Sequence, residues 1–223
     1  MKKDINQLFE FLIATEKLKQ DVRHSWTGNK NRQESVAEHT WFMALFAIVF
    51  FPNLSKKVDQ LKTLKMIIVH DLAEAMTGDI PAQEISARKT RKAENESKAM
   101  KRLIKLLPYQ KVRNEVLSLW EEYEKGESPE AELVKMIDKT EVLVQHNISD
   151  ITTWDCTEYP LALYAKDYLS DFDKFTRAFK DQLDIWTVTK ICKESDISKI
   201  NPDELKLFKQ KNKRNKNLKN ILN

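Results

Sequence analysis

The most apolar stretches of this chain contain histidines and aspartates, and these residues restrict how the chain can fold. His70 and Asp71 stand together in MIIVHDLAEA. His39 precedes a second apolar segment, and Asp138 lies inside LVKMIDKTEVLV. A charged side chain that is buried without a partner costs several kcal/mol. One divalent cation bound by all four side chains would satisfy them together, so we expect three distant segments to converge.

The segments around these residues are predicted to be helical. Gly occurs three times and Pro six times among 223 residues, and 32% of the residues are charged. This composition suits helices with solvated outer faces better than a sheet with many turns. We expect an all-α helical bundle that forms a single domain over residues 1–200, followed by a basic helical tail over residues 201–223.

Capping residues mark the start of two helices. Ser35 and Glu38 have the spacing of a capping box, which we prefer to a catalytic role for Glu38. Ser128 followed by Pro129 marks the start of the helix that contains Asp138.

One continuous helix is expected to carry the His-Asp pair. It should start near Ser55, continue past Glu74 and end at Gly78, because glycine tolerates the left-handed conformation that follows a helix and Pro81 blocks its resumption. The run WFMALFAIVFF, residues 41–51, is too short to span a bilayer, which needs about 20 residues. Because the run is apolar on every side, we expect it to be buried in the core.

Charge and cysteine content limit the partners. Residues 203–223 carry seven Lys or Arg and two Asp or Glu, which exceeds the whole net charge of +4. The rest of the chain is close to neutral, so no nucleic-acid partner is expected. A solvated tail is preferred to one that binds phosphates. Cys156 and Cys192 have no metal-type spacing, and no signal peptide or membrane segment is visible, which indicates a cytoplasmic protein with reduced thiols.

The predicted ligand set has two imidazoles, two carboxylates and no thiolate. Such a set favours one divalent ion with open positions, namely Mn, Fe, Co, Ni or Zn, over a closed structural zinc site. The alternatives are a satisfied core histidine at each position and an Asp138 that only pairs with Lys135 or Lys139.

Two further carboxylates follow the His-Asp pair. Glu74 lies one helical turn after His70, and Asp79 follows closely, where the two carboxyls can act as general base and acid. The alternative for Glu74 is to orient His70, and the alternative for Asp79 is to cap the loop after Gly78.

Three segments resemble HD-superfamily metal-dependent phosphohydrolases, and most closely the small HD-domain 5′-deoxynucleotidases. These segments are ESVAEHTW, HDLAEAMTGDIP and SPEAELVKMIDKTE, and the resemblance covers about residues 8–150. It implies the all-α HD fold, a homodimer, and hydrolysis of deoxyribonucleoside 5′-monophosphates to deoxynucleoside and phosphate. It also implies that one divalent ion is bound by four residues: His39, His70, Asp71 and Asp138.

The resemblance further implies that an Arg and a Trp ahead of the first His contact the substrate. Arg23 and Trp26 match these positions, although His24 and Ser25 separate them. Arg23 would bind the phosphate through two hydrogen bonds, and Trp26 would exclude a 2′-hydroxyl. The alternatives are a surface ion pair for Arg23, for example with Asp21, and a core position for Trp26.

Two other functions remain possible on the sequence. One is hydrolysis of another nucleotide, such as a nucleoside triphosphate or an alarmone; Ala75 after Glu74 counts against the alarmone, because alarmone hydrolases resemble HDxxED. The other is a non-catalytic regulatory module that binds a metal or a nucleotide. Glu74 and Asp79 favour catalysis, because a binding module does not need them.

Overall fold

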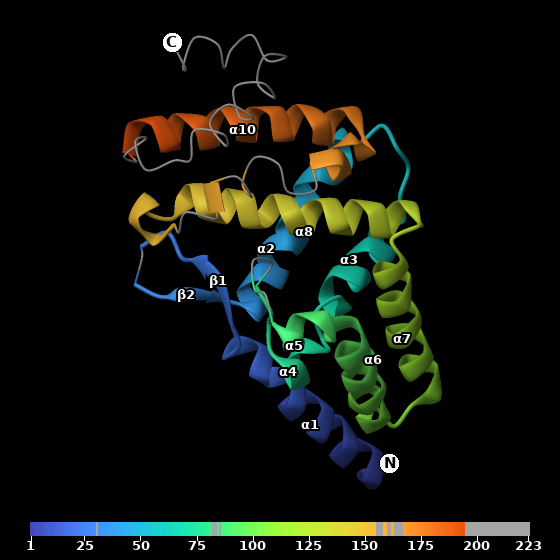
Figure 1. The fold of residues 1–223 in the computed structure, drawn as a ribbon. Helices are drawn as coiled ribbons and strands as arrows, with labels where there is room; N and C mark the ends of the chain where they lie inside the picture. The colour runs from blue at the N-terminus through green and yellow to red at the C-terminus, as the bar shows by residue number, and fades with distance from the viewer. Residues whose placement is uncertain are drawn as a thin grey trace.

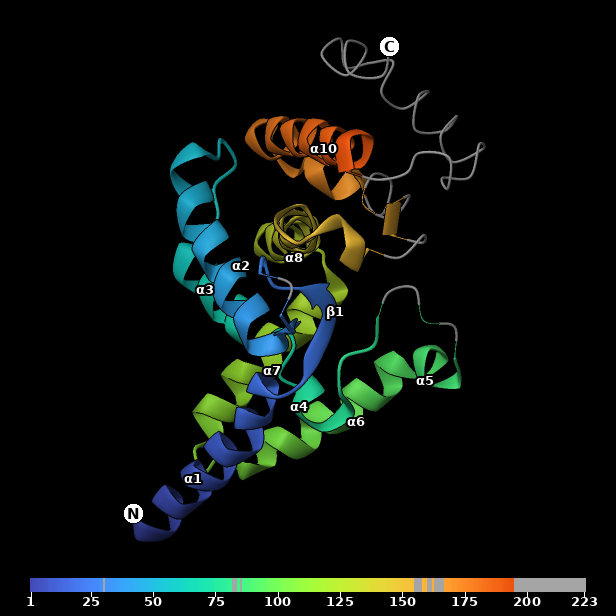
Figure 2. The ribbon, with the colours of Figure 1, turned by 90° about the vertical axis from the view of Figure 1, so that its left-hand side faces the viewer.

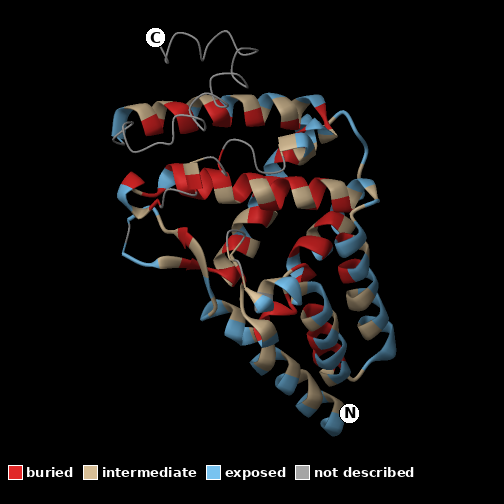
Figure 3. Ribbon diagram, in the orientation of Figure 1, coloured by how far each residue is buried: buried red, intermediate tan, exposed pale blue. Residues whose placement is uncertain are grey.

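Helix α8 (Pro129–Ile148) is the central element of the computed structural model, and other elements pack around it on several sides (Figures 1 and 2). The Ser128 side chain accepts a hydrogen bond from the Ala131 N–H, and Pro129 occupies the first turn, so the predicted helix start is confirmed. Buried positions are concentrated along α8 (Figure 3). The structure describes residues 1–29, 31–81, 84, 86–154, 158–159, 162 and 167–194.

The all-α prediction is confirmed over these residues. The other longer helices are α1 (Lys2–Glu16), α2 (Val36–Phe50), α3 (Gln60–Val69), α6 (Lys92–Leu103), α7 (Gln110–Lys125) and α10 (Lys174–Glu194). The predicted tail and Cys156 lie outside the described residues, so the boundary at residue 200 stays a prediction.

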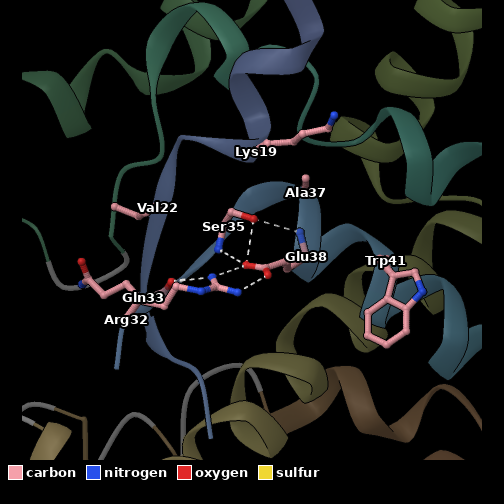
Figure 4. Close-up of a pocket in the computed structure, with 8 residues that line it drawn as sticks. All are labelled: Lys19, Val22, Arg32, Gln33, Ser35, Ala37, Glu38 and Trp41. Carbon is pink, nitrogen blue, oxygen red and sulfur yellow. Dashed lines mark hydrogen bonds and ion pairs between the residues drawn. The ribbon is translucent and has the colours of Figure 1, made fainter. Parts of the chain in front are cut away.

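Helix α2 starts with the predicted capping box. The Ser35 side chain accepts a hydrogen bond from the Glu38 N–H at 3.3 Å, and the Glu38 carboxylate accepts one from the Ser35 N–H at 2.9 Å. Arg32 forms an ion pair with the same carboxylate (Figure 4). Glu38 therefore has the structural role that was expected, and it holds the start of the helix on which His39 lies.

The prediction that the apolar run of α2 is fully buried is wrong. Met43 and Phe50 are buried against the core, but Trp41 is 65% exposed and Ile48 is 54% exposed. By length and composition alone, the window Val36–Asn53 could cross a membrane, and one third of it is buried. The same helix packs against α3 and α8 and is part of the bundle. An apolar helix has no polar face to mark which side meets the core, so its pattern could not predict this exposure.

The prediction of one continuous helix through His70 is also wrong. Helix α3 starts after Asp59, whose side chain caps it, and ends at Val69; the short helix α4 (Glu74–Thr77) follows. Between these two helices, backbone N–H groups donate hydrogen bonds to the carbonyl oxygen three residues earlier. One example is Glu74 N–H to Asp71 C=O at 3.0 Å. Such tight turns replace the regular α-helical bonds.

A small antiparallel sheet was not predicted. Strand β1 (Val22–Trp26) pairs with β2 (Gln33–Ser35), and the register shifts between the pairs Val22 with Ser35 and Trp26 with Gln33. Such a bulge turns side chains that would otherwise alternate between the two faces of a strand. It brings Arg23, His24 and Ser25 to line one pocket.

Candidate metal centre

His39 lies in the first turn of α2 and is completely buried. Its Nδ1 is 2.5 Å from Glu141 Oε2, and its Nε2 is 3.3 Å from Asp138 Oδ1. A hydrogen bond from Nδ1–H to the Glu141 carboxylate leaves the Nε2 lone pair facing Asp138. The residues before α2 fix the backbone of His39, and α8 fixes the orientation of its ring.

His70 and Asp71 lie in the tight turn after α3. His70 Nδ1 is 2.7 Å from the Ile67 carbonyl oxygen, to which it donates, so Nε2 again carries the lone pair. The Nε2 atom is 3.0 Å from Asp71 Oδ2. The two neighbouring side chains therefore meet at one point, although adjacent residues in this helical backbone diverge by about 100°.

The predicted ligands from three distant segments converge. Ligand atoms of His39, His70 and Asp138 all lie within 4.8 Å of one another, and Asp71 contacts His70 directly. Bonds of about 2 Å from such atoms to one ion fit this spacing. The Nε2 atoms of both histidines are buried without a hydrogen-bond partner among the described residues. Two buried lone pairs beside two carboxylates fit a divalent cation.

Asp138 lies among the predicted metal ligands, and it also forms the ion pair with Lys139 that was the alternative to metal binding. Its Oδ2 accepts a hydrogen bond from the Tyr123 hydroxyl at 3.1 Å and lies 2.8 Å from Lys139 Nζ. Its Oδ1 faces His39. Burial raises the pKa of Asp138, but Lys139 and His39 outweigh it, and the pKa lies well below the usual range. The carboxylate therefore stays ionised, as a metal ligand must.

The site attracts positive charge. Burial and Arg23 lower the pKa of His39, but Glu141 and Asp138 raise it further, to about 9. Burial also raises the pKa of Asp71, yet His70 and Arg23 hold it far below its usual value. Protons and metal ions compete for such groups.

Glu74 is buried at the start of α4, and Lys92 Nζ lies 3.3 Å from its Oε1. Its other oxygen, Oε2, is buried and has no hydrogen-bond partner within the described part of the chain. Burial, followed by the charges of Asp71 and Asp79, raises the pKa of Glu74 to about 9. Without a metal ion this carboxyl therefore holds a proton at neutral pH. A divalent cation bound beside it would lower the pKa again, into the range in which the carboxylate can accept a proton.

Arg23 is in the site and not at the surface. Its Nη1 is 3.4 Å from Asp71 Oδ2 and 3.9 Å from Asp79 Oδ1. Burial lowers the pKa of Arg23, but Asp71 and Asp79 outweigh it, so the guanidinium stays charged. The Asp79 N–H donates to Asp21 Oδ2 at 2.9 Å, which fixes the loop after Gly78.

These residues line a pocket of about 740 Å³, and α8 forms one of its walls. Six of the eight predicted site residues line this pocket, and the side chain of a seventh, His39, contacts the lining residue Asp138. Trp26 is the exception, since it is not among the lining residues, although its neighbours His24 and Ser25 are. The sequence analysis missed Lys92, Tyr123 and Glu141. Only Glu141 had a signal, because it follows Asp138 by three residues on one face of a helix.

Comparisons with known proteins show which family the chain resembles. The model of the HD domain family matches residues 15–177. A human protein named 5′-deoxynucleotidase HDDC2 is 38% identical over 140 residues, which cover 62% of this chain and 66% of that protein, just under two thirds. The 5′-deoxynucleotidase YGK1 of Saccharomyces cerevisiae is 29% identical over 187 residues, which cover 82% of this chain and 80% of that protein.

Solved structures share the fold. One from Magnetospirillum magnetotacticum, described as a predicted metal-dependent phosphohydrolase, has a TM-score of 0.71 at 25% identity and covers 83% of this chain and 93% of its own. The PH0347 protein of Pyrococcus horikoshii has a TM-score of 0.60 at 28% identity, with coverages of 80% and 98%.

Proposed function

Since this chain belongs to the HD domain family, we propose that it is a metal-dependent phosphohydrolase that removes the 5′-phosphate from deoxyribonucleoside 5′-monophosphates. The convergence of ligand atoms of His39, His70 and Asp138 to within 4.8 Å of one another carries the proposal. The names of the human and yeast relatives support the substrate class.

The residues in the pocket fit one divalent cation. His39, His70, Asp71 and Asp138 would hold it through nitrogen and oxygen atoms, a donor set that Mn, Fe, Co, Ni and Zn all accept. When bound, such an ion lowers the pKa of a water molecule and withdraws charge from the phosphate. The buried lone pairs of the two histidines support this assignment.

Arg23 and Glu74 have separate tasks in the proposed reaction. The Arg23 guanidinium stays charged, and it can orient the phosphate and neutralise part of its charge. We assign Glu74 Oε2 as the atom that accepts a proton from the attacking water, because it is buried in the pocket wall without a partner among the described residues. Asp79 assists in positioning or in proton transfer, and Lys92 orients the Glu74 carboxylate.

Selectivity for deoxy substrates is part of the proposal, and the names of the relatives support it. The part assigned to Trp26 stays a prediction, since this side chain is not in the pocket lining. Ser25 and His24 lie in the lining instead, next to Arg23.

We also propose that the protein is a homodimer that uses the outer face of α2. The exposed side chains recur one and two turns apart on that helix, which is the spacing of a contact stripe. A contiguous exposed apolar surface of this kind is typical of a protein–protein interface. The stripe consists of Trp41, Leu45, Ile48 and Val49.

A nucleotide panel tests the activity. Metal-free protein is supplied with Mn²⁺ or Co²⁺ and incubated with dAMP, dGMP, dTMP, AMP, 3′-AMP and dGTP, and inorganic phosphate, pyrophosphate and triphosphate are measured. We expect phosphate from the 5′-deoxynucleotides only. Equal phosphate release from AMP would show that the protein does not select deoxynucleotides. Pyrophosphate or triphosphate from dGTP would favour the alternative that the protein hydrolyses nucleoside triphosphates. The absence of any product would leave a non-catalytic module.

A further inference from the structure

Two buried glutamates lie behind His39, and the reaction described above does not use them. Glu34 is in β2, directly before the capping box of α2, and Glu141 is on α8. Both are buried, and Glu141 is completely so. A carboxylate oxygen of each lies within 4.8 Å of the other and of a His39 ring nitrogen. The three side chains form a buried cluster that extends from the predicted ion toward β2.

The contact between His39 and Glu141 determines which ring nitrogen is available. Because Nδ1 is 2.5 Å from Glu141 Oε2, the hydrogen of the neutral ring belongs on Nδ1, and Nε2 presents its lone pair on the opposite side. Carboxylates in this position orient metal-binding histidines and increase their basicity. A change at Glu141 therefore acts on the ion through His39.

Glu34 and Glu141 cannot both be charged at such a distance in a dry environment without a large cost. Glu34 Oε2 and Glu141 Oε1 are each buried without a hydrogen-bond partner among the described residues. A hydrogen on Glu34 that is directed at the Glu141 carboxylate satisfies both groups. Burial and then Glu141 raise the pKa of Glu34 to about 8, which agrees with this arrangement.

We propose that Glu141 and Glu34 are positioning residues for the metal centre. Glu141 holds the His39 ring with Nε2 toward the ion, and Glu34 holds the Glu141 carboxylate by donating a hydrogen bond to it. This inference rests on the proposed role of His39 as a metal ligand. It assigns to the glutamates an effect on metal affinity and ligand geometry, and none on the binding of the phosphate.

Cobalt binding tests the inference without an activity assay. The dissociation constant for Co²⁺ is measured by competition with a chelator, the Co²⁺ absorption spectrum is recorded, and the bound metal is counted per chain. We expect Glu141→Ala to weaken Co²⁺ binding by about 10- to 100-fold and to shift the absorption bands. Glu34→Leu should weaken binding less. Glu34→Gln keeps a donor toward Glu141 and should stay within about threefold of the wild type.

Asp173→Asn is the matched control. Asp173 is a buried carboxylate that accepts hydrogen bonds from the backbone of Ser55, Lys56 and Phe175, away from the pocket lining. This variant should lose stability and keep the wild-type affinity for Co²⁺. If Glu141→Ala does not fold in its metal-free form, the comparison of Glu34→Leu with Glu34→Gln decides instead, because only Glu34→Leu removes the donor toward Glu141 and should weaken Co²⁺ binding.

Wild-type affinity and spectrum in a folded Glu141→Ala protein would overturn the inference while leaving the proposed function intact. Two Co²⁺ ions per wild-type chain, with one lost in Glu34→Gln, would show that the glutamates bind a second cation and would also overturn it. A wild-type protein that binds no Co²⁺ would contradict the proposed function itself.

Discussion

The two faces of α2 reverse the usual distribution of polar and apolar groups. The inner face buries His39 among carboxylates, whereas the outer face exposes Trp41 and Ile48 to solvent. A buried polar group and an exposed apolar patch are the informative departures from the general rule that apolar residues lie inside. The comparison supports both proposals, an ion at the inner face and a dimer contact at the outer face.

The largest expected effect comes from the inner face. His39→Ala removes one of the converging ligands and leaves Asp138 without its imidazole neighbour. Phosphate release from dAMP should fall by about three orders of magnitude or more at saturating Mn²⁺. A variant with more than about a tenth of the wild-type rate would show that His39 is not part of the metal centre.

Glu74→Gln separates catalysis from metal binding in the same pocket. The amide cannot accept a proton, so kcat should fall by about 10²- to 10⁴-fold. The metal content should not change, since the predicted ligands are intact. Steady-state kinetics and elemental analysis of the same preparation test both statements. Unchanged turnover would exclude Glu74 from the reaction.

Two side-chain truncations compare how much the inner and the outer face of α2 contribute to the free energy of unfolding. Met43 is completely buried, and Met43→Ala should lower the free energy of unfolding by about 2–5 kcal/mol. Ile48→Ala, on the exposed side, should change it by less than about 1 kcal/mol in the monomer. Denaturant unfolding at low protein concentration measures both. Equal losses would mean that the outer face is as well packed as the inner one.

Ile48→Glu tests the outer face as a dimer surface. A carboxylate in the centre of the exposed stripe should convert the proposed dimer to a monomer, because an unpaired charge would be buried between the copies. Sedimentation velocity measures the change, and far-UV circular dichroism should show the same helix content. Ser118→Glu, at an exposed position of α7, adds the same charge away from the stripe and should leave the oligomeric state unchanged. A monomeric wild-type protein at high concentration would contradict the dimer proposal.

A smaller effect than that of Met43→Ala is expected at the start of α2. Ser35→Ala removes the side-chain cap that Figure 4 shows and should cost about 1 kcal/mol of unfolding free energy. Thermal unfolding measures this loss. A much larger loss would mean that the capping box supports β2 and Glu34 as well as the helix.

The features that could be predicted from the sequence depend on hydrogen bonds within one helical turn or on the high free-energy cost of burying a charge. Ser35 and Ser128 mark helix starts by hydrogen bonds within one turn, and the cost of buried charge made the convergence of His39, His70 and Asp138 predictable. The break after Val69 was not predictable in this way, because the tight turn is favoured by tertiary contacts and contains no Gly or Pro. Lys92 gave no signal either, since a lysine in a charged helix is usually solvated.

Metal counting on metal-free protein tests most directly whether the converging side chains hold one divalent ion. Wild-type protein and Asp138→Asn are dialysed to equilibrium against micromolar Co²⁺, and the bound metal is measured by elemental analysis. We predict about one ion per wild-type chain and less than about a tenth of an ion in the variant, because a neutral amide is a far weaker ligand than a carboxylate. No bound ion in the wild type, or equal binding in both proteins, would contradict the metal centre.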